Sequence, residues 1–118
     1  MRTLKHIFPF LILLLLACSA ETEKKASVDK QTPIWIDVRT ADEFATGHLS
    51  EAINIPHTEI RTKIDSIVTD KTLPINVYCR SGHRSGIAKG ILEDLGYKNV
   101  INEGGYEEIL KKRESEKK

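Results

Sequence analysis

The stretch Ile75–Gly86, INVYCRSGHRSG, changes character at a single cysteine. The residues before Cys79 form an apolar, β-rich run that predicts a buried strand. The residues after it are basic and include glycine, and from Ser85 the pattern SGIAKGILEDLG predicts a helix. A strand that passes through a short loop into a helix is the repeating unit of α/β folds, so this stretch sets the fold class.

The region 33–112 alternates strand and helix patterns throughout. We expect strands at 34–38, 52–56, 75–79 and 99–102, and helices at 40–47, 58–68, 85–96 and 106–114. Thr40, with Glu43 three residues later, predicts a capping box at the start of the helix at 40–47. The helix at 85–96 should pack through Ile87, Ile91, Leu92 and Leu95, and the helix at 58–68 through Ile60, Ile64, Ile67 and Val68. This alternation predicts an α/β domain with a parallel sheet of four to five strands flanked by helices. Ligands bind such sheets at the carboxyl ends of the strands, where Cys79 lies.

The length and charge of the chain restrict its class. Its 118 residues, 40% hydrophobic and 30% charged, suit one small globular domain with a modest core. The formal net charge is +1, and without Arg2 and Lys5 the chain has 16 basic against 17 acidic side chains, a net of −1. This balance gives no electrostatic support for general nucleic-acid binding. We therefore expect no nucleic-acid partner, and we expect the domain to be monomeric.

The N-terminal segment predicts export and lipid attachment. Residues 1–17 have a charged start and an apolar run too short to span a bilayer, as in a signal peptide. The sequence LLAC at 15–18 resembles a bacterial lipobox, which implies a lipoprotein signal peptide and lipid on Cys18. An ordinary cleaved signal peptide and a retained anchor are the alternatives. We expect residues 18–32 to be a lipidated flexible tether, residues 113–118 a charged tail, and the protein to face the periplasm from the outer membrane.

The cysteine count draws attention to Cys79. The chain has two cysteines, which an exported protein would ordinarily pair in a disulfide. If Cys18 carries lipid, the folded part keeps Cys79 as its single thiol. A free thiol in an exported protein is a liability unless it is used, so Cys79 is the candidate nucleophile.

The loop after Cys79 has the composition of an anion-binding loop. Gly82 allows the chain to curl so that several N–H groups point inward, in front of a helix N-terminus that carries partial positive charge. These groups, with nearby basic side chains, should lower the pKa of Cys79 and bind an anion. The candidate binding residues are Arg80, Ser81, Gly82, His83, Arg84 and Ser85.

Each of these residues also has a structural interpretation. Cys79 could be a buried core residue, Arg80 and His83 could be solvated, and Ser81 and Ser85 could cap the helix. Arg84 should be ordered by a carboxylate. We expect Asp37 and Arg39 to give structural support, Trp35 to be a core residue, and His48 to be packed and hydrogen-bonded. The histidines show no metal-ligand spacing, and no nucleotide motif is present, so we expect neither a metal nor a cofactor.

Three segments together resemble the rhodanese family of sulfurtransferases. The loop CRSGHRS at 79–85 is similar to the family's active-site loop. The segment IDVRTADEFATGHLSEAINIP at 36–56 resembles its Asp-x-Arg and Gly-His motifs, and INEGGYEEI at 101–109 resembles its Gly-Gly motif. The chain is most similar to the small exported rhodaneses of the phage-shock type. Little sequence precedes Ile34 that could form the additional first strand of larger rhodanese domains.

The resemblance implies a covalent sulfur transfer. Cys79 would take the outer sulfur of a small anionic donor such as thiosulfate, hold it as a persulfide, and pass it to a thiol or cyanide acceptor. One alternative is a sulfur-carrier or binding module without catalysis. The other is a phosphatase or arsenate reductase, but those enzymes carry a Cys-x5-Arg loop, and the spacing from Cys79 to Arg84 is Cys-x4-Arg.

Overall fold

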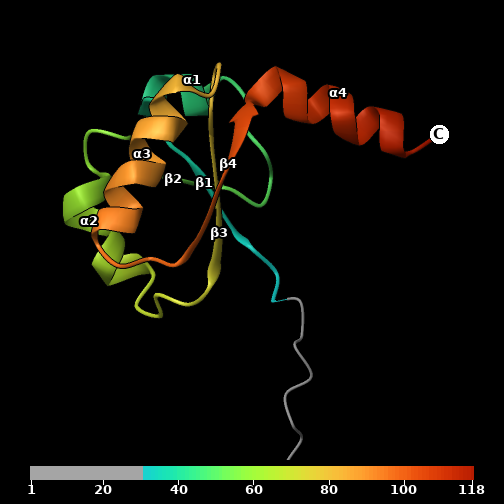
Figure 1. The fold of residues 1–118 in the computed structure, drawn as a ribbon. Coiled ribbons are helices and arrows are strands. Elements are labelled where there is room, and N and C mark those ends of the chain that lie inside the picture. Colours follow the sequence, from blue (N-terminus) through green and yellow to red (C-terminus); the bar gives the residue numbers. More distant parts are fainter. Residues whose placement is uncertain (1–30) are drawn as a thin grey trace, which may run out of the picture.

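Four parallel strands form a single sheet in the order β2-β1-β3-β4 (Figure 1). The structure is a computed structural model that describes residues 31–118, so the expected signal peptide, Cys18 and most of the tether lie outside the described residues. The strands are β1 (Ile34–Asp37), β2 (Ile53–Asn54), β3 (Pro74–Cys79) and β4 (Asn99–Gly105). The helices are α1 (Ala41–Ala45), α2 (Ile60–Ile67), α3 (His83–Asp94) and α4 (Tyr106–Glu116).

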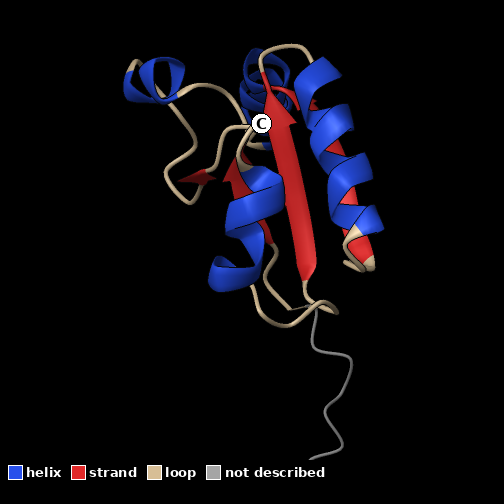
Figure 2. Cartoon of the chain, turned by 90° about the vertical axis from the view of Figure 1, so that its left-hand side faces the viewer, coloured by secondary structure: helices blue, strands red, loops and turns tan. Residues whose placement is uncertain are grey.

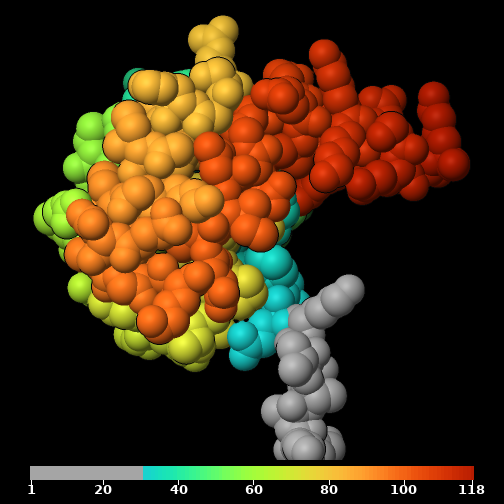
Figure 3. Space-filling model, viewed as in Figure 1, coloured from blue at the N-terminus to red at the C-terminus, as the bar shows by residue number. Residues whose placement is uncertain are grey.

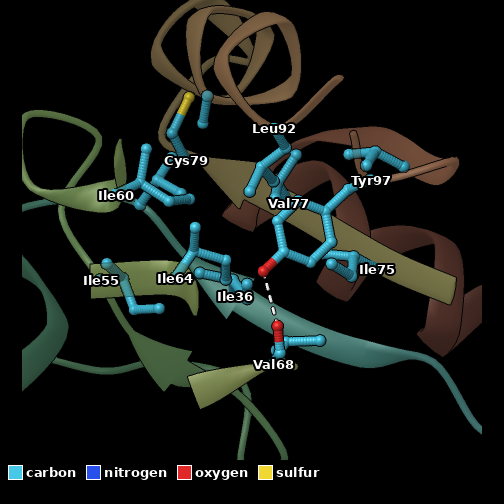
Figure 4. Close-up of a cluster of buried hydrophobic side chains, with 13 residues drawn as sticks. Ile36, Ile55, Ile60, Ile64, Val68, Ile75, Val77, Cys79, Leu92 and Tyr97 are labelled. Atoms are coloured by element: carbon cyan, nitrogen blue, oxygen red, sulfur yellow. Dashed lines mark hydrogen bonds between the residues drawn. The ribbon is translucent and has the colours of Figure 1, made fainter. Parts of the chain in front are cut away.

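One face of the sheet is covered by α2 and α3 (Figures 1 and 2). Alternate side chains of β1 and β3 point to this face and meet the isoleucines of α2 and the small and apolar residues of α3. Figure 4 shows this cluster, with Cys79 at one end and the Tyr97 hydroxyl donating to the Val68 carbonyl at the other. Most of the buried apolar residues lie on this face. Full burial of one such aliphatic side chain stabilises the fold by roughly 1.5–3 kcal/mol.

The opposite face of the sheet has a smaller cluster. Tyr78 and Ile109 are buried there, and Trp35 packs against them while partly exposed. Helix α4 contributes Ile109 as its buried residue and then projects away from the body of the domain (Figures 1 and 3). Of the helices in residues 31–118, none is both long enough and apolar enough to cross a bilayer.

The predicted fold class is confirmed, and two details of the predicted packing are wrong. Ile87 is 43% exposed and Ile67 is 47% exposed, although both were expected on buried helix faces. In α3 the buried positions are Ser85, Ala88 and Leu92. A pattern based on large apolar residues misplaces this face because two of its members are small.

Element boundaries also differ from the predicted ones. Helix α3 begins at His83 rather than Ser85, and β4 continues to Gly105 rather than ending at Asn102. Helix α4 continues to Glu116, so it includes part of the expected charged tail. The Arg113 guanidinium lies 4.9 Å from the centre of the Trp35 ring and pairs with Glu51, which ties the second half of α4 to the domain.

Candidate active site around Cys79

Cys79 is the last residue of β3 and its sulfur faces into the following loop. The backbone N–H of Gly82 donates to Sγ at 3.0 Å, and the Ser85 hydroxyl lies 3.4 Å from Sγ. The cysteine is 1% exposed. The sulfur therefore faces the inward-pointing amide of the loop, as expected, but a reagent reaches it only when the loop or a neighbouring side chain moves.

The environment of Cys79 favours the thiolate. Burial raises the pKa of the thiol, but the Ser85 hydroxyl and the backbone N–H groups of Ser85, Ser81 and Gly82 lower it by more, so the pKa lies below its ordinary value. These donors come from the loop and the first turn of α3, where the helix dipole adds to their effect. A larger fraction of Cys79 is therefore thiolate, the nucleophilic form, at neutral pH than in an ordinary cysteine.

Glycines give the loop its tight shape. Gly82 is the N-cap of α3 with a left-handed φ of 96°, which disfavours any residue with a side chain. A Cβ atom on Gly82 would lie 3.3 Å from the Cα of Gly104. A Cβ atom on Gly105 would collide with the backbone carbonyl of Arg80. The Gly104–Gly105 pair thus forms the surface on which the loop rests.

Arg84 forms an ion pair with Glu43 and does not contact the sulfur. Its two terminal nitrogens bond the two carboxylate oxygens at 2.6 and 2.9 Å, which raises the pKa of Arg84. Glu43 also completes the capping box of α1 with Thr40, as predicted. The expectation of an ordering carboxylate is met by Glu43. Arg84 therefore braces the loop against α1, and it acts on the thiolate through its charge rather than through a hydrogen bond.

Replacing Glu43 with glutamine should remove a pH-dependent part of the stability. The hydrogen bond from Arg84 lowers the pKa of Glu43 from 4.5 to about 2. Because the folded-state pKa is depressed, this stabilisation is present above pH 4.5 and is lost as the pH falls through about 2. We expect Glu43→Gln to lower the free energy of unfolding by about 1 kcal/mol at neutral pH, a modest effect because the ion pair is partly exposed. The difference in unfolding free energy between the variant and the parent chain should disappear in acid.

Denaturant unfolding at neutral and acidic pH measures this effect. Glu59→Gln is the matched control, because it removes an exposed ion pair with Lys63 that lies away from the loop, and it should change stability little. A gap between Glu43→Gln and the parent chain that stayed constant across the acid range would contradict the assignment of the stabilisation to the carboxylate.

Arg80 and His83 remain exposed beside the loop. Neither side chain has a hydrogen bond or ion pair among the described residues. A hollow of about 250 Å³ lies next to Arg80, lined by Arg39, Glu43, Thr46, Arg80, Tyr106 and Glu107. Arg80 is thus an exposed cation that immediately follows Cys79 in the chain and is available to a small anion.

Asp37 and Arg39 form a buried pair behind the site. Asp37 is 0% exposed and accepts bonds from the backbone N–H and the guanidinium of Arg39, and the guanidinium also donates to the Gly47 carbonyl. The guanidinium carbon lies 5.8 Å from the centre of the Tyr78 ring and 4.7 Å from the centre of the Tyr106 ring. These bonds give Asp37 and Arg39 a structural role, as we expected. Neither side chain hydrogen-bonds the Cys79 sulfur.

Ser81, Ser85 and His48 were also expected to have structural roles, and the structure gives them different surroundings. Ser85 is fully buried inside the first turn of α3, and the N-cap of that helix, Gly82, makes no side-chain bond, so neither Ser81 nor Ser85 is the expected helix cap. His48 bonds the Phe44 carbonyl at 2.8 Å and stacks on its ring. Within residues 31–118, no three His, Cys, Asp or Glu side chains group together as metal ligands.

The structure adds two residues that the sequence did not indicate. Glu43 was recognised as part of a capping box, but its pairing with Arg84, 41 residues away, had no local signal. Asn102 accepts a hydrogen bond from Ser85 at 2.7 Å and donates one to the Gly82 carbonyl at 3.0 Å. Its position before the Gly-Gly motif was the single signal that could have indicated it.

A family model and a similar curated protein both relate this chain to the rhodaneses. A family model described as Rhodanese-like domain matches residues 20–112. The protein named thiosulfate sulfurtransferase PspE, from Escherichia coli, is 44% identical over 75 residues, which cover 64% of this chain and 72% of that protein.

Solved structures agree with the sequence comparison. A structure of a rhodanese with anions from E. coli superposes with a TM-score of 0.62 at 42% identity, covering 64% of this chain and 89% of the other. The human single-domain sulfurtransferase TSTD1 gives a TM-score of 0.60 at 26% identity, covering 68% of this chain and 82% of the other.

Proposed function

This chain belongs to the rhodanese family of sulfurtransferases, and from this premise we propose that Cys79 carries a sulfane sulfur, as a persulfide, from a donor such as thiosulfate to a thiol or cyanide acceptor. The observation that carries the proposal is the position of Sγ, 3.0 Å from the Gly82 N–H and within reach of the Ser85 hydroxyl. Such donors stabilise a thiolate before the reaction and the terminal sulfur charge of a persulfide after it.

The proposed reaction has two balanced steps. In the first, the Cys79 thiolate attacks the outer sulfur of thiosulfate, a sulfur–sulfur bond to the cysteine forms, and sulfite leaves with the electron pair of the broken bond. In the second, cyanide attacks the outer sulfur, thiocyanate leaves the enzyme, and the electron pair returns to Cys79 as the thiolate. Neither step needs an external oxidant or reductant.

Arg80 is the best-placed residue for attracting the donor. Its side chain is exposed at the hollow beside the loop, whereas the charges of Arg84 and Arg39 are balanced by Glu43 and Asp37. Thiosulfate carries two negative charges, so an exposed cation without an ion-pair partner on the loop increases its local concentration. The roles of Ser81 and His83 are limited in this proposal to the shape of the loop and its charge.

A second candidate function is sulfur carriage without significant turnover. The observation that favours it is the 1% exposure of Cys79, since a buried persulfide would exchange slowly with acceptors. The Cys-x4-Arg spacing still argues against a phosphatase, because the loop lacks the residue that would widen it for a tetrahedral oxyanion.

We further propose that the chain is an exported lipoprotein. The support is the charged and apolar segment 1–17 followed by LLAC at 15–18, with the polar segment 18–32 linking Cys18 to the domain. In this proposal the monomeric domain faces the periplasm, and lipid on Cys18 holds it at the outer membrane.

Intact-mass spectrometry tests both proposals. In the full chain carrying Cys18→Ala, Cys79 is the single thiol. Incubation with thiosulfate should add about 32 Da, the mass of one sulfur atom, and cyanide should remove it. The parent chain taken from membranes should carry an additional lipid mass that Cys18→Ala lacks. No mass gain with thiosulfate would overturn the persulfide proposal, and equal masses after allowing for the substitution would overturn lipidation.

The same experiment separates the two functions. A gain of mass that cyanide removes repeatedly, with thiocyanate accumulating, supports the enzyme. A gain of mass without accumulation of thiocyanate supports the carrier.

A further inference from the structure

Asn102 lies at a junction between β4 and the Cys79 loop. It immediately precedes a β-bulge, because Val77 pairs with Asn102 and Tyr78 pairs with Gly104, which leaves Glu103 as the extra residue. Bulges of this kind redirect side chains and are frequent next to active sites. Asn102 lies on the face of the sheet that α3 covers, and its side chain meets the first turn of that helix.

The hydrogen bonds of Asn102 fix the orientation of its amide. Oδ1 accepts from the backbone N–H of Gly104 at 3.0 Å, and Nδ2 donates to the Gly82 carbonyl at 3.0 Å. In a flipped amide, Nδ2 would face the N–H of Gly104 and Oδ1 would face the carbonyl of Gly82, so donor would meet donor and acceptor would meet acceptor. The flipped form is therefore excluded. The oxygen of Asn102 therefore faces Ser85.

This orientation sets up a competition for one proton. The Ser85 hydroxyl has a single hydrogen, and it can donate either to Asn102 Oδ1 at 2.7 Å or to Cys79 Sγ at 3.4 Å. Ser85 is fully buried, so water does not offer a third acceptor. The shorter distance belongs to Asn102, so the proton is shared between the two acceptors and the sulfur receives it only part of the time.

We propose that Asn102 is a positioning residue that competes with the Cys79 sulfur for the hydroxyl proton of Ser85, and that it thereby limits how strongly the serine stabilises the thiolate. The proposal rests on the proposed function in taking Cys79 as the reactive sulfur. In this proposal Asn102 on β4 affects the thiolate fraction of Cys79 on β3.

The charged groups around the sulfur do not change when Asn102 is replaced by leucine. On α3, Arg84 acts on Cys79 by its charge, but it is paired with Glu43 of α1. Asp37 of β1 is paired with Arg39. Arg80 and His83 are exposed to solvent on the loop, where their fields are screened. A change of the Cys79 titration in the Asn102→Leu variant therefore reports on the local hydrogen bonds.

Titration of Cys79 by the ultraviolet absorbance of its thiolate tests the proposal, in the full chain carrying Cys18→Ala. Leucine has the branched shape of asparagine without its acceptor, so Asn102→Leu leaves the serine proton to the sulfur. At a fixed pH below the midpoint, we expect about two- to tenfold more thiolate than in the parent chain, the effect of about one hydrogen bond. Asn102→Asp retains the acceptor and adds a negative charge, so its midpoint should rise.

Further variants show whether Asn102 acts through Ser85. In the Ser85→Ala background, Asn102→Leu should have no further effect on the titration. Asn99→Leu is the matched control, since Asn99 lies on the same strand and donates to the Thr72 carbonyl at 2.6 Å, away from the sulfur, and its midpoint should match the parent. An unchanged or raised midpoint in Asn102→Leu, or a shift that persists with Ser85→Ala, would overturn the proposal. These titrations use no sulfur donor, so their failure is distinct from failure of the mass test.

Discussion

Replacing Cys79 with serine should reduce thiocyanate production from thiosulfate and cyanide by at least about 10³-fold. The serine oxygen would occupy the same position against the Gly82 N–H, so the fold and the anion-binding loop should persist. A hydroxyl in this place is not ionised at neutral pH and does not form a persulfide. The variant should also show no mass gain with thiosulfate.

Cys18→Ser is the matched control, because it removes the other cysteine of the chain and should retain full turnover in detergent or in soluble form. Unfolding measurements on Cys79→Ser establish that the variant is folded. Equal thiocyanate production in the folded Cys79→Ser variant and the parent chain would remove Cys79 as the nucleophile.

Replacing Gly105 with alanine should damage both stability and activity. The backbone angles of Gly105, φ −97° and ψ 147°, suit any residue, so the obstacle is steric alone. The new Cβ would collide with the Arg80 carbonyl and would lie 2.9 Å from a carboxylate oxygen of Glu108. Because the first contact is with backbone, the loop must shift. We expect a loss of about 1–3 kcal/mol in the free energy of unfolding.

The displaced loop should also lower turnover by about 10- to 100-fold, because the amides that face the sulfur would move with it. Gly90→Ala is the matched control, since a Cβ at Gly90 in α3 meets nothing within 4 Å and alanine favours a helix. That variant should retain activity and gain up to about 1 kcal/mol. Retention of normal activity in a folded Gly105→Ala variant would show that the loop does not depend on this contact.

Local sequence patterns were sufficient to predict the fold and the position of Cys79. The alternation of strands and helices gave the parallel sheet, and the change of character at Cys79 placed a thiol at the carboxyl end of β3. The capping box of Thr40 and Glu43 was also predictable from the sequence, because its two residues lie three positions apart. Features of this kind depend on neighbours along the chain, and the sequence contains them directly.

The partners of the loop depend on tertiary structure, and for that reason they were not predictable in the same way. Arg84 was expected to meet a carboxylate, but its partner comes from 41 residues earlier. Asn102 meets Ser85, 17 residues earlier, and the pattern of β4 reveals neither this contact nor the bulge that follows Asn102. The resemblance to the rhodanese family indicated the Gly-Gly motif, while its physical reason, the contact of Gly105 with the Arg80 carbonyl, is visible only in the tertiary structure.

The burial of Cys79 has a consequence for cross-linking between molecules. A disulfide requires two sulfurs to approach within about 2 Å, with their backbones no more than about 7 Å apart. Because the Cys79 sulfur lies beneath its own loop with 1% of the residue exposed, two folded copies cannot meet this geometry. Oxidative dimerisation through this thiol is therefore sterically blocked, and the site can hold a reactive sulfur without the chain becoming covalently paired to another copy of itself.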